Sequence, residues 1–213
     1  MLKDHLKRRY TAKWWDDKEV EQEKLNNVLE TTYLAPSKQG IYPYTVIVAT
    51  NSIEGKTFKN WLFYDHTWCV DGIRGKKSDN LKVYNGQVLA PILLVYLCHS
   101  QNISNQQLIL EYTMDTIVSA TIAMCAAEEQ GLQTGFCACL HGLTIAEKLK
   151  VSDATCTVLL GIGYATHDLR IRRGLYDSND KLYGMDRSNT DPRLKISSNR
   201  LQKKEYENFY KVL

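Results

Sequence analysis

The chain has 213 residues, a length that suits one hydrophobic core, and no linker or change in composition divides it, so we expect a single domain over residues 1–213. The formal net charge of +3 is spread along the chain without a basic stripe of interleaved aromatics, which argues against nucleic acid as a partner. The first residues are charged and no stretch reaches the length of a membrane span, so we expect a cytoplasmic protein with no membrane partner.

The apolar pattern predicts one helix followed by two strands. From Asp17 to Leu34 the apolar residues recur with helical spacing, and Pro36 ends the run, as in a helix that packs on one face. Residues 44–49 are rich in strand-forming residues. Residues 91–97 form an almost continuous apolar run, which is typical of a strand buried on both faces.

The second half of the chain repeats this mixture. Residues 114–129 are small or apolar around most of a helical circumference, which predicts a helix buried on more than one side and ended by Gly131. Residues 136–140 and 157–164 are predicted to form short strands. Helices and strands alternate without strict βαβ order, so the predicted class is α+β.

Two segments have weaker patterns. Residues 52–84 begin with apolar residues and continue into a polar stretch rich in Gly and Lys, which is compatible with a mobile flap. Residues 170–190 are polar and rich in turn-forming residues, and we expect a loop there.

The six cysteines lie mostly in apolar segments, as reduced core thiols do, so we expect no disulfides. A zinc site can be drawn from Cys137, Cys139 and His141 on one strand face together with His66 and Cys69. These groups lack the paired spacings of structural zinc sites. Ordinary strand cysteines and a surface histidine are therefore the favoured interpretation, and no metal is expected.

The segment 9–16 reads RYTAKWWD and is the best functional clue. Arg9, Thr11 and Lys13 alternate, so an extended backbone would present all three to one phosphate group. Taken alone, the segment is more simply a cluster that contacts only water. Its two tryptophans could stack on a ligand, but residues in this position more often belong to the core or to a hydrophobic staple.

Five blocks in chain order resemble the nitroreductase family of flavin-dependent oxidoreductases. They are RYTAKWWD at 9–16, LAPSKQGIYPY at 34–44, NGQVLAP at 85–91, GLQT at 131–134 and GIGY at 161–164. The likeness runs from about Lys7 to Lys195. It implies an α+β fold with a central, mainly antiparallel β-sheet flanked by helices, and an obligate homodimer.

The resemblance also implies an FMN-dependent NAD(P)H oxidoreductase. NADH or NADPH would reduce FMN, and a small electron-poor acceptor such as a nitroaromatic or a quinone would then be reduced in the same pocket, in a ping-pong cycle. Because FMN carries the electrons, no protein side chain is expected as a catalytic residue. The alternative is a catalytically idle flavin-binding relative that serves sensing, storage or partner binding.

By resemblance, the FMN site is shared between the two chains of the homodimer. Arg9 and Lys13 would bind the phosphate and ribityl chain. An asparagine and a glutamine of the 85–91 block would bond the pyrimidine edge, while the 34–44 block of the partner would line the flavin edge. The implied cofactor-binding residues are Arg9, Tyr10, Thr11, Lys13, Ser37, Lys38, Gly40, Asn85, Gln87, Arg193 and Lys195.

The sequence departs from the family pattern close to the expected pocket. Lys38 stands where serine is usual, Tyr42 where glutamine is usual, and Cys137 and Cys139 where glycine is common. A lysine near the flavin would favour an anionic reduced ring. Gating and packing stay equally open for Tyr42 and Phe136, so the sequence leaves the acceptor undefined.

Overall fold

The computed structural model describes residues 11–66, 86–138 and 140–165. They contain a four-stranded sheet in the order β1-β2-β4-β3, with every neighbouring pair antiparallel. The strands are β1 (Tyr44–Ala49), β2 (Ile92–Cys98), β3 (Gln133–Cys137) and β4 (Thr155–Gly163). The predicted α+β class and the mainly antiparallel sheet are confirmed.

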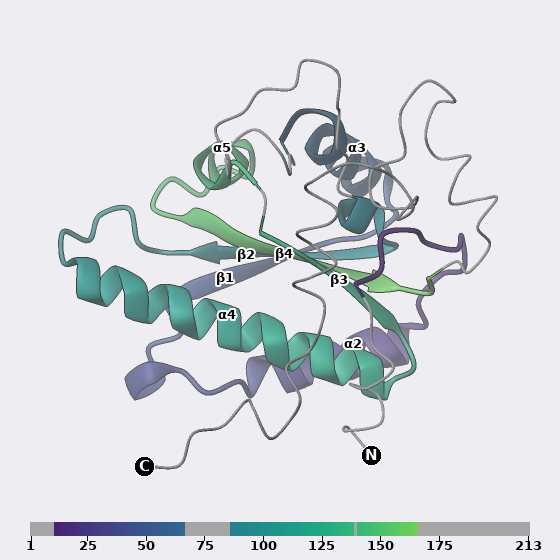
Figure 1. Cartoon of the computed structure of the whole chain (residues 1–213), viewed down its shortest axis with the longest axis horizontal. Helices are drawn as coiled ribbons and strands as arrows, with labels where there is room; N and C mark the ends of the chain where they lie inside the picture. Colours follow the sequence, from purple (N-terminus) through teal and green to yellow (C-terminus); the bar gives the residue numbers. More distant parts are fainter. Residues whose placement is uncertain (1–10, 67–85, 139, 166–213) are drawn as a thin grey trace, which may run out of the picture. The chain divides into compact units, whose positions relative to one another are not determined.

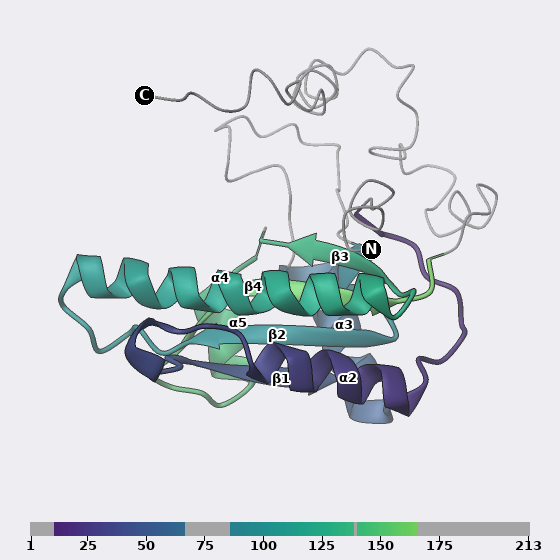
Figure 2. The ribbon, with the colours of Figure 1, turned by 90° about the horizontal axis from the view of Figure 1, so that it is seen from below.

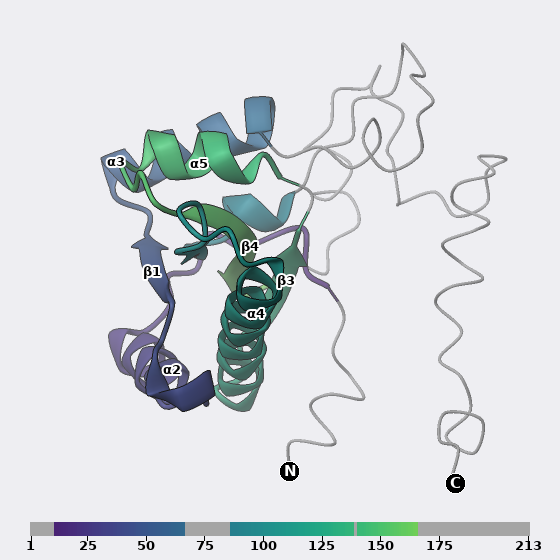
Figure 3. The ribbon, with the colours of Figure 1, turned by 90° about the vertical axis from the view of Figure 1, so that its left-hand side faces the viewer.

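Helices cover both faces of this sheet (Figure 1). On one face α2 (Gln22–Tyr33) and α4 (Gln106–Glu129) lie side by side, as Figures 2 and 3 show from two directions. On the other face lie α3 (Ile53–Trp61) and α5 (Gly142–Lys148). Three short helical turns complete the fold: η1 (Lys38–Gly40), η2 (Leu62–His66) and η3 (Gly86–Leu89).

Strand β2 divides the hydrophobic core into two layers. Its seven residues are all buried, which confirms the predicted strand with two covered faces. Alternate side chains, starting from Ile92, pack under α2 and α4. The intervening ones, starting from Leu93, pack under α3, η2 and α5, because successive residues of a strand point to opposite faces.

Helix α4 has a defined cap at each end. The Asn105 side chain accepts hydrogen bonds from the backbone N–H groups of Gln107 (2.9 Å) and Leu108 (3.3 Å), which satisfies two otherwise unpaired donors. Gly131, with φ +75°, closes the other end in a Schellman motif: its own N–H donates to Glu128 and the next N–H donates to Ala127. The predicted stop at Gly131 is confirmed, whereas the helix begins eight residues before the predicted start.

The expectation that no stretch reaches the length of a membrane span is wrong. By length and composition, the 24-residue α4 could cross a membrane. In this fold it packs instead along the sheet, with Ala120, Ala123 and Ala127 fully buried. Small residues on that face let the helix approach the strands closely.

Several predicted boundaries are corrected. Strand β4 begins at Thr155, two residues before the predicted start. The first helix begins at Gln22 rather than Asp17. Strand β3 begins at Gln133, three residues before the predicted start, because Gln133 and its neighbours pair with the last residues of β4. The first part of the predicted flap is ordered: Ser52 caps α3, and Leu62 and Phe63 are buried. Residues 67–84 and the predicted loop 170–190 lie outside the described residues.

Candidate functional site

The N-terminal segment lies across the glycine-rich ends of β3 and β4. The backbone N–H of Ala12 donates to Thr134 on β3 (2.8 Å), and that of Asp16 donates to Tyr164 after β4 (2.8 Å). The indole N–H of Trp15 donates to the carbonyl of Gly86 (2.9 Å). The segment is therefore fixed both to the sheet and to η3.

Three glycines make this crossing possible. A Cβ atom on Gly86 would lie 2.1 Å from the Lys13 carbonyl oxygen, and one on Gly135 would lie 2.3 Å from the Ala12 carbonyl oxygen. On Gly161 it would lie 2.2 Å from the carbonyl oxygen of Gln87. Real Cβ atoms do not approach backbone oxygens so closely, so only glycine allows the N-terminal segment and η3 to meet on this part of the sheet.

This crossing brings together three of the expected cofactor-binding residues. Thr11 is exposed, Lys13 is half-buried, and Gln87 is 5% exposed beside the segment. The side-chain oxygen of Gln87 is buried and accepts no hydrogen bond from any of the residues that the structure describes. Leaving such an oxygen unpaired costs about 1–3 kcal/mol, so the site suits a ligand that donates an N–H to it.

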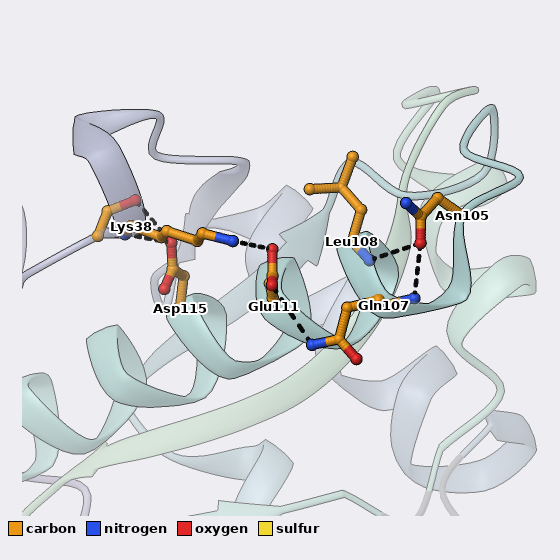
Figure 4. A network of polar contacts seen from close by, with 7 residues as sticks. Lys38, Asn105, Gln107, Leu108, Glu111 and Asp115 are labelled. Carbon is orange, nitrogen blue, oxygen red and sulfur yellow. Dashed lines mark hydrogen bonds and ion pairs between the residues drawn. The ribbon is translucent and has the colours of Figure 1, made fainter.

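The residues of the 34–44 block form a second group, held by α4. One carboxylate oxygen of Asp115 accepts hydrogen bonds from the Ser37 hydroxyl (2.7 Å) and from the Lys38 backbone N–H (2.8 Å). The Lys38 ammonium pairs with Glu111 one turn earlier on α4 (Figure 4). This contact lowers the pKa of Glu111, and it compensates the lysine charge within the same chain.

One chain does not bring the two groups together. They lie at opposite ends of α2 (Figure 1), a helix of 12 residues and thus about 18 Å long. Gly40 is exposed within η1 and adopts a left-handed φ of +67°. The remaining expected residues lie outside the described residues: Arg9, Tyr10, Asn85, Arg193 and Lys195.

Phe136 and Tyr42, for which the sequence leaves gating and packing equally possible, differ in their surroundings. Phe136 packs against the core cluster under α2 and α4, which favours packing over gating. Tyr42 is 47% exposed and its ring is parallel to that of Tyr33, with centroids 6.5 Å apart. Trp14 is buried, which confirms its assignment to the core.

A metal centre and a reactive thiol gain no support from this geometry. Across residues 11–66, 86–138 and 140–165, no group of three or more His, Cys, Asp or Glu side chains could hold a metal ion. Cys69 and Cys139 of the drawn zinc site lie outside these ranges. Burial raises the pKa of Cys156 to about 12, with a smaller contribution from Cys137, so Cys156 is a structural thiol.

Comparison with known proteins agrees with the resemblance seen in the sequence. The profile of the Nitroreductase family matches residues 6–164, a span that covers most of the chain. The chain belongs to the nitroreductase family. No match is found among curated proteins.

Solved structures of the nitroreductase fold align with most of the chain. An FMN-dependent nitroreductase from Clostridium difficile R20291 is 23% identical, with 77% of this chain and 87% of that chain covered and a TM-score of 0.58. A Staphylococcus epidermidis ATCC 12228 protein provisionally named an NAD(P)H:FMN oxidoreductase is 14% identical, with 79% and 88% covered and a TM-score of 0.62. A gut-bacterial enone reductase of fatty acid biohydrogenation is 13% identical, with 78% and 90% covered and a TM-score of 0.62. Identities this low establish the shared fold only.

Sequence reasoning missed the carboxylates that support the site. Asp115 and Glu111 are spaced i, i+4 on α4 and face the 37–42 loop, a contact between segments more than seventy residues apart. Glu128 is buried and accepts a hydrogen bond from the Thr134 hydroxyl (2.8 Å) below the N-terminal segment. Acidic residues on an otherwise apolar helix were the signal that could have marked these three positions.

Proposed function

We propose that this nitroreductase family member is an FMN-dependent NAD(P)H oxidoreductase that reduces a small electron-poor acceptor, such as a nitroaromatic or a quinone, by a ping-pong cycle. Family membership supports an oxidoreductase. The names of structural relatives support FMN and NAD(P)H. The observation that carries the proposal is the buried, unpaired side-chain oxygen of Gln87 at the crossing of η3 and the N-terminal segment.

The residues at this crossing have the chemistry that an FMN molecule requires. Lys13 provides a cation for the phosphate, and the Gln87 oxygen accepts a hydrogen bond from an N–H of the pyrimidine edge. Gly86 and Gly135 keep the backbone close, where a side chain would separate these groups. Bound FMN would supply the redox chemistry, in which NAD(P)H, the acceptor and one proton yield NAD(P)⁺ and the acceptor reduced by two electrons and two protons.

We also propose that the site is completed in a homodimer. Four large apolar residues on α4 are exposed with helical spacing: Leu110, Met114, Ile117 and Val118. An apolar stripe of this kind is typical of a surface that a partner covers. A second copy could also bring its Ser37 to Gly40 group to the Lys13 and Gln87 group, which one chain holds apart.

The experiment is reconstitution followed by reduction. Protein incubated with FMN and freed of excess ligand should keep the flavin absorbance band. The Gln87→Leu variant should bind FMN roughly tenfold more weakly, because it loses one hydrogen bond between uncharged groups. Leucine matches the apolar bulk of the glutamine stem, so the fold is retained. Anaerobic NADH or NADPH should then bleach the band within seconds.

Each failure has a separate meaning. A bound flavin that neither cofactor bleaches would support the idle relative instead of the enzyme. Protein that takes up no flavin at all would refute both interpretations. Equal FMN affinity of the Gln87→Leu variant and the parent protein would remove the assigned role of Gln87.

A further inference from the structure

The loop from Ser37 to Tyr42 has an unusual backbone. Three of its residues have left-handed φ angles: Gln39 (56°), Gly40 (67°) and Tyr42 (51°). This region is easy for glycine but uncommon for a glutamine or a tyrosine. Such conformations persist where surrounding contacts hold them, and they concentrate at functional sites.

The contacts that hold this loop come from Asp115 on α4. Its carboxylate accepts the Ser37 hydroxyl hydrogen and the Lys38 backbone N–H (Figure 4). The Ser37 oxygen in turn accepts the backbone N–H of Tyr42 (2.9 Å). Asp115 therefore reaches Tyr42 through one hydroxyl group, and this relay closes the loop. Charge-assisted hydrogen bonds of this kind are the stronger ones.

The relay sets the position of an aromatic pair. The ring of Tyr42 lies within 9° of parallel to that of Tyr33, at the end of α2, with centroids 6.5 Å apart. Both rings are exposed, Tyr42 by 47% and Tyr33 by 78%. Tyr42 thus offers flat π surface in the same loop that carries Ser37, Lys38 and Gly40, with Tyr33 beside it.

Resting on the proposed function, we propose that Asp115 is a positioning residue and that, through Ser37, it fixes Tyr42 as a specificity-determining side chain for flat aromatic acceptors. Ring stacking favours planar aromatic molecules over aliphatic ones of equal charge and size. The acceptor class is therefore aromatic, as in nitroaromatics, rather than a linear enone. The aromatic pair selects the acceptor and takes no part in electron transfer.

The test uses FMN-loaded protein and a pair of ligands that cannot be reduced. Benzoate and cyclohexanecarboxylate carry the same charge on rings of similar size, and only benzoate is flat and aromatic. Calorimetry gives the ratio of their dissociation constants for the parent protein and four variants: Tyr42→Leu, Asp115→Leu, Asp115→Asn and Glu111→Gln. Leucine at position 42 meets the same left-handed backbone as tyrosine, so this variant changes the ring alone.

We expect the parent protein to prefer benzoate. Tyr42→Leu and Asp115→Leu should reduce that preference roughly two- to tenfold. Asp115→Asn should keep most of it, because the amide oxygen still accepts the Ser37 hydrogen. Glu111→Gln is the matched control: on the same helix it removes the negative charge that faces Lys38 and leaves the relay intact, so the preference should stay.

Two results would overturn the inference while the proposed function stands: flavin bleached normally by NAD(P)H with no benzoate preference in the parent protein, or an unchanged preference in Asp115→Leu. A Tyr42→Leu variant that weakens self-association without changing the preference would assign the pair to a subunit contact and would also overturn it. Protein that binds no FMN would refute the inference together with the proposed function.

Discussion

Replacing Gly135 with alanine tests the crossing on which the site depends. Gly135 lies in β3 and its φ is not left-handed, so alanine is compatible with the backbone and the effect is steric. The new Cβ would lie 2.3 Å from the Ala12 carbonyl oxygen, more than 1 Å inside ordinary contact, and a backbone atom cannot rotate away. The N-terminal segment must therefore shift away from the strand.

The magnitude follows from what that shift disrupts. Overpacking of this kind costs about 1–3 kcal/mol, and weakening the hydrogen bond from Ala12 to Thr134 costs about 1 kcal/mol more. The lower chain entropy of alanine in the unfolded state offsets about 0.4–1 kcal/mol. The expected net loss is about 1–4 kcal/mol in the free energy of unfolding. Lys13 and Gln87 move apart in the same step, so FMN should bind at least about tenfold more weakly.

Urea unfolding and FMN fluorescence titration measure the two effects separately. Gly131→Ala is the control, because its new Cβ meets nothing within 4 Å but the residue has φ +75°. It should lose about 1 kcal/mol from backbone strain and leave FMN affinity unchanged. If Gly135→Ala matched the parent protein in both measurements, the N-terminal segment would not lie on β3.

The remaining predictions concern stability and assembly. Lys59→Met removes a buried ammonium that donates to the backbone carbonyls of Ala90 and Pro91 (2.7 and 3.2 Å), just before β2. Chemical denaturation should therefore show a loss of about 1–3 kcal/mol in the free energy of unfolding. Burial, and secondarily a nearby lysine, lowers the pKa of Lys59 to about 8 from 10.5. Between pH 8 and 10.5 the unfolded chain therefore binds more protons than the folded one, and the free energy of unfolding of the parent protein should rise with pH. The Lys59→Met variant should lack this rise. The hydrogen bond from Tyr164 lowers the pKa of Glu21 to about 2 from 4.5. The ionised carboxylate therefore stabilises the fold above pH 4.5, and this contribution is lost as the pH drops toward 2. The Glu21→Gln variant should show a smaller fall in Tm over this pH range than the parent protein. Met114→Glu, which places a charge on the exposed stripe of α4, should shift the protein from dimer to monomer in sedimentation, and an unchanged mass would count against that interface.

Most of the fold could be predicted because its elements are encoded locally. The β1 strand from Tyr44 to Ala49 was predicted at its observed bounds, and the apolar run of β2 was predicted as a doubly buried strand. Element ends were harder. Asn105 at the start of α4 and Ser52 at the start of α3 are both capping residues whose side chains accept backbone N–H hydrogen bonds, and the predicted elements made no use of either cap.

The site was less accessible from the sequence, because its geometry is made by contacts between distant segments. The sequence identified Lys13 and Gln87 as candidates, but their proximity depends on Gly86, Gly135 and the strand pairing beneath them. Glycines in a strand predict that another backbone segment approaches closely, but they do not identify that segment.

Lys38 shows how a distant contact changes an interpretation. Taken from the sequence, it is an unpaired cation beside the flavin, able to stabilise an anionic reduced ring. In the fold it pairs with Glu111, and its backbone is bound by Asp115. The local positive charge is thereby offset, so any effect of Lys38 on the flavin is weaker than that of a free ammonium. Of the residues that differ from the family pattern, Tyr42 is then the one that bears on substrate choice. Helix α4 sets its position through Asp115 and Ser37.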